Sequence, residues 1–203
     1  MNIVTSKYAR FENFLPIEVN QSLMEFTLNH ESYFIQRPTS PDYPAQYAFG
    51  APNGFTAWKF VILKQVKLCL PQVFKALDLK PFDVGEIETD VSSYPDMGYL
   101  ATHNDTFCAN TRVLSFVYYY QNFEKSFSGG QLALYDSEVD CFLNTQKANS
   151  CHLIEPENNT CVFFPSRCWH EVLPVACDFK SFPNNYFSGG RFSINGWIHK
   201  AFN

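Results

Sequence analysis

The chain has 203 residues, of which 46% are hydrophobic and 17% are charged, and its formal net charge is −5. This composition can form one sizeable core, and the acidic balance argues against a general nucleic-acid binder, which would present a basic face. No apolar run reaches the roughly 18 residues of a membrane span, and the first residues lack the charged-then-apolar order of a signal peptide. We therefore expect a cytoplasmic protein with neither a membrane nor a nucleic-acid partner.

The first 80 residues carry helical patterns. Apolar residues at helical spacing predict a helix over 17–31, with Pro16 near its start. The segment 39–55 is rich in Pro, Gly, Tyr and Asp, and predicts a long loop or an irregular hairpin. A second helix is predicted over 56–77, and Pro71 is expected to kink it or to break it into two helices.

After Pro81 the pattern changes to short runs of period-two character. Such runs predict strands, and they cover 86–91, 113–120, 131–135, 160–164 and 191–198. Turn signals separate them at Ser128-Gly-Gly, Glu157-Asn-Asn and Ser188-Gly-Gly. The pattern predicts an α+β, mainly β protein, with helices packed outside an antiparallel sandwich or barrel. We treat 1–203 as one domain, with helical support and a loop in 1–80 and the β core in 81–203.

The seven cysteines form an odd set without a CxxC pair. In a reducing compartment they are expected to be free thiols, several of them buried. A zinc site built from Cys151, His152, Cys161 and Cys168 is an alternative, but it matches no usual ligand spacing. The cysteines therefore do not indicate a metal centre.

A stronger candidate for a metal site combines His103-Asn104-Asp105 with His170. In an extended segment, residues i and i+2 point to one face, so His103 and Asp105 can reach one ion. His170 follows an apolar run after a short loop, where a strand end can present it inward. Each motif alone is weak, because a surface His beside a turn Asp is common and a lone His is more often structural. Together they supply the two imidazoles and one carboxylate of the facial triad of non-haem Fe(II).

A candidate anion clamp lies near the end of the chain. Arg191 and Ser193 share a strand face, and a guanidinium with a neighbouring hydroxyl matches a carboxylate. Tyr119 shares a face with Ser115 and Val117, and its phenol can donate to the same carboxylate. The alternatives are an exposed arginine at a strand start and an aromatic side chain that packs in the core.

The order of these motifs is more specific than any one of them. The chain runs His-x-Asp, Ser-Gly-Gly, His-Glu-Val-x-Pro and Arg-x-Ser. This order resembles the 2-oxoglutarate and Fe(II)-dependent dioxygenases, specifically their prolyl-4-hydroxylase-like branch, over roughly 84–199. The resemblance implies a double-stranded β-helix, or jelly-roll, braced by N-terminal helices. It also implies Fe(II) and 2-oxoglutarate as cofactors, O2 as co-substrate and ascorbate as a candidate reductant.

The resemblance assigns roles residue by residue. His103, Asp105 and His170 would ligate iron, and Arg191 would pair with the distal carboxylate of 2-oxoglutarate, assisted by Tyr119 and Ser193. The collagen-type members carry Lys where this chain has Arg191. Asp105 argues against halogenation, because related halogenases lack a carboxylate at this position.

The implied reaction is hydroxylation of an unactivated C–H bond, with release of succinate and CO2. The resemblance favours a peptide or protein side chain as substrate, and a free amino acid or small metabolite is the alternative. Two further alternatives remain. One is a catalytically silent jelly-roll that binds a partner, and the other is a cupin-like protein that holds another metal. The 39–55 loop would close over the substrate as a lid or would be a Pro-rich surface connection.

Overall fold

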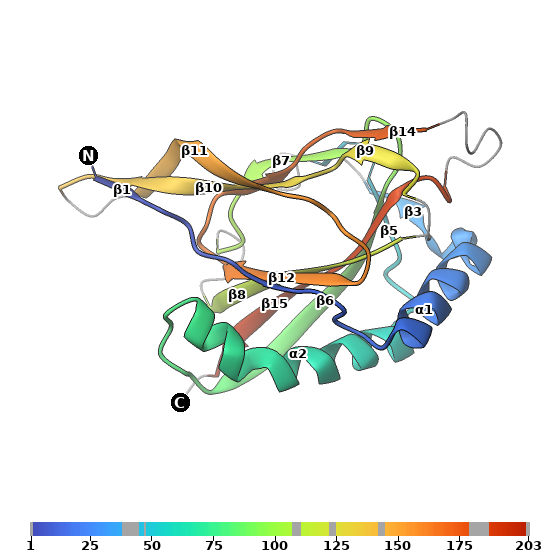
Figure 1. Ribbon diagram of the computed structural model, residues 1–203, viewed down its shortest axis with the longest axis horizontal. Coiled ribbons are helices and arrows are strands. Elements are labelled where there is room, and N and C mark those ends of the chain that lie inside the picture. Colours follow the sequence, from blue (N-terminus) through green and yellow to red (C-terminus); the bar gives the residue numbers. More distant parts are fainter. Residues whose placement is uncertain are drawn as a thin grey trace.

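Two antiparallel β-sheets face each other in the computed structural model, and two helices cover the outer face of the larger sheet (Figure 1). The structure describes residues 2–37, 45–46, 48–106, 111–121, 125–141, 145–178 and 187–201. Among these residues, no helix is both long enough and apolar enough to cross a membrane. The arrangement is the predicted jelly-roll core with supporting helices.

The larger sheet has seven strands within the described residues. Their order is β2 (Ala9–Phe11), β12 (Thr160–Pro165), β8 (Arg112–Tyr120), β15 (Arg191–Lys200), β6 (Val84–Tyr94), β5 (Phe49–Gly50) and β3 (Ile35–Gln36). The long strands β8, β15 and β6 form its centre, and all the pairings are antiparallel.

The smaller sheet lies opposite it. Within the described residues its order is β1 (Asn2–Val4), β10 (Leu132–Val139), β13 (His170–Val172), β7 (Tyr99–His103) and β4 (Ala45–Gln46), and β11 (Thr145–Ile154) pairs with β10. A separate pair joins β9 (Phe127–Gly129) to β14 (Val175–Cys177).

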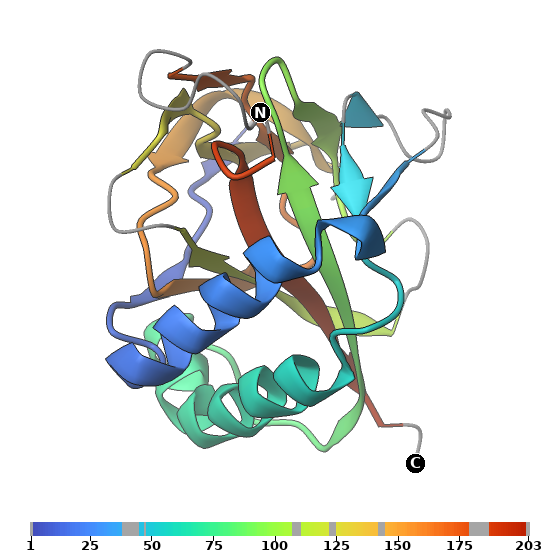
Figure 2. The same ribbon diagram turned by 90° about the vertical axis from the view of Figure 1, so that its right-hand side faces the viewer.

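The helices α1 (Ile17–Asn29) and α2 (Thr56–Ala76) lie next to each other along the larger sheet (Figure 2). A short 3-10 helix, η1 (Glu31–Tyr33), follows α1. The predicted break at Pro71 is wrong, because α2 continues through it. Tertiary packing explains why: Leu70, Val73 and Phe74 around the proline are buried in the core, and burial of such side chains stabilises each by about 1.5–3 kcal/mol.

Strand β8 shows how one sequence serves two packing layers. Its even-numbered residues, Leu114, Phe116, Tyr118 and Tyr120, belong to the core shared with the helices. Val117 and Tyr119, at odd-numbered positions, belong to the core between the two sheets. Because successive side chains on a strand alternate between faces, the odd-numbered positions, including Ser115, line the interior of the jelly-roll.

The 39–55 segment is only partly a loop. Its described residues include β4, which pairs with β7, and β5, which pairs with β6 and with β3. The two strands inside the segment, β4 and β5, do not pair with each other, and β3, the partner of β5, lies before residue 39. Residues 38–44 and 47 lie outside the described residues, so the lid remains a prediction.

Candidate metal centre

Two histidines meet on the interior face of the smaller sheet. His103 is the last residue of β7, and His170 is the first residue of β13. The two residues lie directly opposite each other in the antiparallel register, and their ring centroids are 4.2 Å apart. Directly opposite side chains share a face, so both imidazoles point to the same side of the sheet.

Asp105 reaches this pair by a different route from the one expected. The extended conformation predicted for 103–105 is wrong, because β7 ends at His103 and Asp105 lies in the following turn. Its backbone N–H donates to the carbonyl oxygen of Ser166 at 2.9 Å. Its carboxylate Oδ2 accepts a hydrogen bond from Ser115 Oγ at 2.5 Å. These contacts, rather than strand alternation, bring the carboxylate to the histidines.

Backbone carbonyls set the tautomer of both rings. Nδ1 of His103 lies 2.9 Å from the carbonyl oxygen of Ala101, and Nδ1 of His170 lies 3.0 Å from that of Cys168. A carbonyl oxygen only accepts, so each Nδ1 carries the proton and donates it. Each Nε2 therefore keeps its lone pair, which is the form of histidine that binds a metal.

The three ligand groups converge. Nε2 of His103 lies 3.6 Å from Oδ1 of Asp105, and Nε2 of His170 lies 3.6 Å from Oδ2 of the same carboxylate. One ligand atom from each residue lies within 4.8 Å of the others. Atoms that each lie about 2 Å from one ion at right angles are about 3 Å apart. A small contraction would therefore complete a three-ligand site.

The buried groups hold the charge states that a cation requires. Burial lowers the pKa of His170 to about 4, so its ring is neutral near pH 7. Burial alone would raise the pKa of Asp105, but His170, His103 and Ser115 together hold it well below its ordinary value. A neutral imidazole and a carboxylate are the protonation states that bind a divalent metal.

A cavity of about 400 Å³ adjoins the triad, and Arg191 forms part of its wall. This arginine begins β15 and is 1% exposed. Its Nη1 donates to Ser193 Oγ at 3.4 Å. Its guanidinium carbon lies 4.8 Å from the ring centroid of Tyr119 and 5.2 Å from that of Tyr94. Within the described part of the chain, no carboxylate pairs with this guanidinium, whereas three other arginines each pair with at least one.

Two buried polar atoms at this position lack a partner among the described residues, Nε of Arg191 and Oη of Tyr119. Burial raises the pKa of Tyr119, so its phenol stays protonated and remains a donor. A guanidinium buried without a counterion is destabilising by several kcal/mol, and a carboxylate that accepts from both donors would relieve this penalty. The donors therefore fit the distal carboxylate of 2-oxoglutarate, and the triad fits Fe(II).

The Ser-Gly-Gly segment, predicted as a turn, places Ser128 and Gly129 in strand β9, and Gly130 follows that strand beside the arginine. Gly130 has φ +66°, and a Cβ built on it would lie 2.8 Å from Cδ of Arg191. Only a residue without a side chain lets the backbone approach the arginine stem this closely and adopt this conformation.

The six residues singled out from the sequence thus gather at one cavity. His103, Asp105, His170 and Arg191 line it, and Tyr119 and Ser193 contact Arg191. Sequence reasoning missed Ser166, Tyr94 and the hydrogen bond from Ser115 to Asp105. For Tyr94 and Ser115 the signal was the period-two pattern of β6 and β8, but only strand register shows which positions face the triad, and Ser166, which follows β12, had no such signal.

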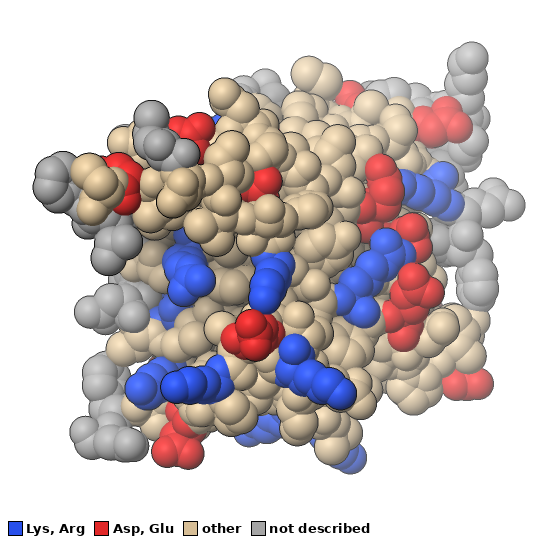
Figure 3. All heavy atoms as spheres, turned by 60° about the vertical axis from the view of Figure 1, so that its left-hand side comes forward, with Lys and Arg blue, Asp and Glu red and all other residues tan. Residues whose placement is uncertain are grey.

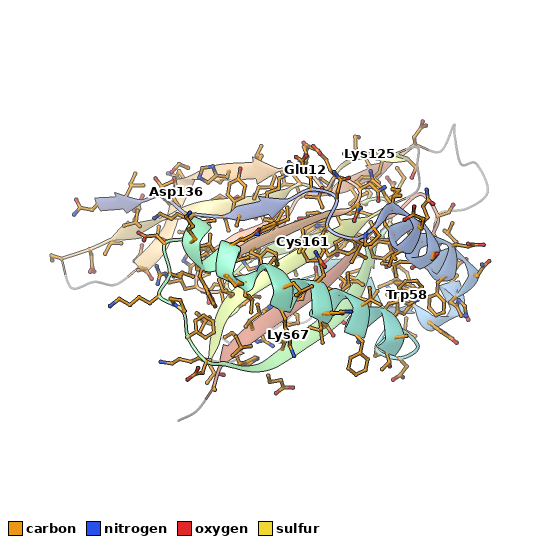
Figure 4. The ribbon with its side chains drawn as sticks, turned by 60° about the horizontal axis from the view of Figure 1, so that its bottom comes forward. Glu12, Trp58, Lys67, Lys125, Asp136 and Cys161 are labelled. Atoms are coloured by element: carbon orange, nitrogen blue, oxygen red, sulfur yellow. The ribbon has the colours of Figure 1, made fainter. Side chains whose placement is uncertain are left out.

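The alternative zinc site is not assembled. Cys161 is fully buried against the helical layer (Figure 4), whereas Cys151 is exposed on β11. Among the described residues, His103, Asp105 and His170 are the group that can hold a metal ion. The described cysteines are free thiols, as expected, and Cys108 lies outside the described residues.

The fold and the site together define a jelly-roll protein with a His-Asp-His metal centre and an arginine positioned for a carboxylate co-substrate. The chain belongs to the 2OG-Fe(II) oxygenase superfamily, whose family model matches residues 89–199. It is also 34% identical over 201 residues to an uncharacterized PKHD-type hydroxylase of Synechocystis sp.. That match covers 97% of this chain but 64% of the relative, so this chain spans somewhat less than two thirds of that protein's length.

Solved structures with the same fold include prolyl hydroxylases. A Pseudomonas putida prolyl-4-hydroxylase matches with a TM-score of 0.62 and 20% identity, over 98% of this chain and 95% of that one. A Trichoplax adhaerens prolyl hydroxylase, in complex with a peptide fragment of the hypoxia inducible factor oxygen degradation domain, matches with a TM-score of 0.65 and 19% identity. That match covers 97% of this chain and 84% of the other. These two likenesses show that the chain shares the fold of prolyl hydroxylases.

Proposed function

We propose that this chain is an Fe(II)- and 2-oxoglutarate-dependent dioxygenase that hydroxylates an unactivated C–H bond of a peptide or protein side chain, with release of succinate and CO2. The observation that carries the proposal is the position of Arg191 in the wall of the cavity that the triad adjoins, as a buried guanidinium that no carboxylate of the described residues pairs with. A metal site alone would need no such residue.

Different residues of the site would bind the metal and the co-substrate. His103, Asp105 and His170 would hold the iron and, as a facial set, leave three coordination positions open. Arg191 and Tyr119 would bind the distal carboxylate of 2-oxoglutarate and so fix its orientation. When bound, iron and 2-oxoglutarate supply an O2-derived oxidant that removes hydrogen from a substrate carbon.

Apolar walls between these groups limit water. Val117 and Leu132 face each other from the two sheets, and Phe164 packs edge-on against His170 with centroids 4.9 Å apart. A water-poor site strengthens the contacts between the charged groups and the co-substrate. It also protects a reactive oxidant from side reactions.

Two features support a peptide or protein side chain as substrate. Part of the 400 Å³ is needed for the co-substrate, so the remainder suits one side chain entering from a larger molecule. In addition, the guanidinium of Arg112 lies 4.4 Å from the Trp197 ring centroid in the cavity wall and pairs with Glu88. A planar cation held against an indole offers a flat surface with donors, which suits a peptide segment. A free amino acid or small metabolite is the competing substrate class.

The distribution of surface charge on the face drawn in Figure 3 does not argue against a peptide or protein substrate. The face drawn in Figure 3 carries Lys and Arg interspersed with Asp and Glu, so on this face the molecule has no stripe of one sign.

The test begins with anaerobic titration of the apo-protein with Fe(II) and then 2-oxoglutarate, followed by visible absorption. Chelation of the metal by the keto acid should give a weak band at roughly 500–530 nm. His170→Ala should abolish it, and Arg191→Met should shift the titration midpoint to much higher 2-oxoglutarate. Arg167→Met, which removes an exposed arginine near the site, serves as the matched control.

Substrate screening follows with ascorbate present. Succinate release and a mass gain of one oxygen are measured against blocked peptides that contain each residue type, and against free amino acids. Oxygen gain by peptides supports the proposal, and gain by free amino acids alone replaces it with the small-molecule alternative. A folded protein that shows no band with Fe(II) and 2-oxoglutarate would be a binding module.

A further inference from the structure

The interior face of the larger sheet is built in successive layers between the arginine and the rim. In the β6–β15 register, Arg191 lies opposite Tyr94, and Asn195 lies opposite Asp90. Asn195 also lies opposite Val117 of β8. Residues two apart on a strand share a face, so Asp90 and Asn195 are on the same face as the arginine. Both line the cavity.

Asp90 places a carboxylate in this wall, beside the polar side chains of Ser92 and Asn195. Its side chain is 23% exposed, and Arg37 pairs with its Oδ2. Ser92 Oγ donates to the same oxygen at 3.4 Å. Within the described residues, the other oxygen, Oδ1, accepts no hydrogen bond.

Ser92 fixes the orientation of Asn195. The serine hydroxyl has one proton, which it donates to Asp90, so it must accept from Nδ2 of Asn195 at 3.0 Å. The amide oxygen of Asn195 is then the atom left without a partner among the described residues. The wall thus presents two acceptors side by side, one carboxylate oxygen and one amide oxygen.

We propose that Asp90 and Asn195 form an acceptor pair that binds an amide N–H of the substrate beside the carbon that is oxidised. The proposal rests on the proposed function and deepens it, because it restricts the substrate to peptides that keep an N–H next to the target residue. Asp90 and Asn195 are specificity-determining residues in this scheme, and neither ligates the metal.

The charge balance of the wall favours a neutral donor. The guanidinium of Arg37 already neutralises Asp90, so a cationic substrate group would leave a net positive charge in a half-buried site. A neutral amide N–H gains a hydrogen bond to an ionised acceptor without adding charge. An analogue without an N–H donor would leave both acceptors desolvated and unpaired, and this costs more free energy than a hydrogen bond to them gains.

The chain offers a direct probe, because it has three tryptophans. Trp169 and Trp197 line the cavity, whereas Trp58 lies on α2 against Phe26, with centroids 5.8 Å apart (Figure 4). In protein labelled with 5-fluorotryptophan, the Trp197 signal should report binding, and the Trp58 signal should serve as the internal reference.

Two matched ligands are titrated against this signal, N-acetyl-prolinamide and its N,N-dimethylamide, which lacks the N–H donors. The wild-type chain should bind the primary amide at least about fivefold more tightly. Asn195→Val and Asp90→Asn should each bring the ratio of the two dissociation constants close to one. Glu18→Gln, which removes an exposed carboxylate of α1, should leave the ratio unchanged.

Equal binding of the two ligands by the wild-type chain would overturn the proposal, and so would a ratio that survives in Asn195→Val. If neither ligand shifts the Trp197 signal, while 2-oxoglutarate with Fe(II) still does so under anaerobic conditions, the proposal would also be overturned. The titration needs no turnover. If the wild-type chain discriminates between the two ligands but shows no charge-transfer band with Fe(II) and 2-oxoglutarate, the proposed function would be refuted and the acceptor pair would be supported.

Discussion

The hydrogen bond from Ser115 to Asp105 should govern how tightly the chain holds its metal. Ser115 is buried, and its hydroxyl lies 2.5 Å from a carboxylate oxygen that also faces His170. A hydrogen bond to a charged group contributes about 1.5–3 kcal/mol, and loss of such a supporting contact typically weakens metal binding about 10- to 100-fold. Ser115→Ala should therefore lower Fe(II) affinity by about that factor with little change in fold.

The assay is an anaerobic competition between the protein and a chelator of known affinity, with Co(II) absorption as a second report on the ligand geometry. Ser126→Ala is the matched control, since Ser126 is buried but lies outside the cavity lining. Wild-type Fe(II) affinity in Ser115→Ala would refute the assignment of this hydroxyl as the group that positions Asp105.

The hydrogen bond between Ser115 and Ser166 allows a second test, in which the effects of the two serines on metal affinity should depend on each other. Oγ of Ser166 lies 2.9 Å from Oγ of Ser115. The hydroxyl of Ser115 has one proton and donates it to Asp105, so Ser166 is the donor in the bond between the two serines. Ser166→Ala should weaken metal binding by a few-fold, since the bond is between neutral groups. In a Ser115→Ala background the same change should have almost no effect. Equal losses in both backgrounds would mean that the two serines act independently.

Three further outcomes are expected. Arg191→Met should raise the KM for 2-oxoglutarate on the order of 30-fold or more, as expected for about 2–3 kcal/mol of charge-assisted contact, while Fe(II) affinity stays constant; an unchanged KM would exclude the clamp. Gly130→Ala should destabilise the fold by about 1–2 kcal/mol and also raise the KM for 2-oxoglutarate, whereas Gly129→Ala, which meets the carbonyl of Pro174 instead, should affect stability alone. Burial lowers the pKa of His170 to about 4 in the folded chain. As the pH falls, the unfolded chain therefore protonates this histidine at a higher pH than the folded chain does, and the stability of the apo-protein should decrease between about pH 7 and pH 4. The loss from this group should be up to about 3 kcal/mol, and urea unfolding of His170→Asn should show a smaller loss over the same range.

The sequence was most informative where one residue pattern serves one physical purpose. Alternation along β8 predicted that Ser115, Val117 and Tyr119 share one face, and the structure places Val117 and Tyr119 together in the core between the two sheets. The order of the motifs indicated the family, which the match over 89–199 confirms. Both inferences depend on local periodicity or on residue order, and a single chain contains both.

It was less informative where tertiary contacts decide the conformation. Asp105 lies in a turn because Ser166, from a distant loop, accepts its backbone hydrogen bond. Helix α2 continues through Pro71 because core packing on both sides of it outweighs the missing hydrogen bond. Asp90 and Asn195 become a pair only in the β6–β15 register. These features depend on residues far apart in sequence, and local pattern does not encode them.

The two sheets divide the site in a way that separates chemistry from selectivity. The smaller sheet carries His103 and His170, and the larger sheet carries Arg191. In the proposed assignment, the metal and the distal carboxylate of the co-substrate would be anchored on opposite walls, whose spacing the jelly-roll core fixes. Asp90 and Asn195 lie on the larger sheet but contact none of these anchors through a described hydrogen bond. Substitutions at those two positions should therefore change which substrate is accepted while the affinities for Fe(II) and 2-oxoglutarate remain near their original values, and a parallel loss of either affinity would show that the two walls are coupled.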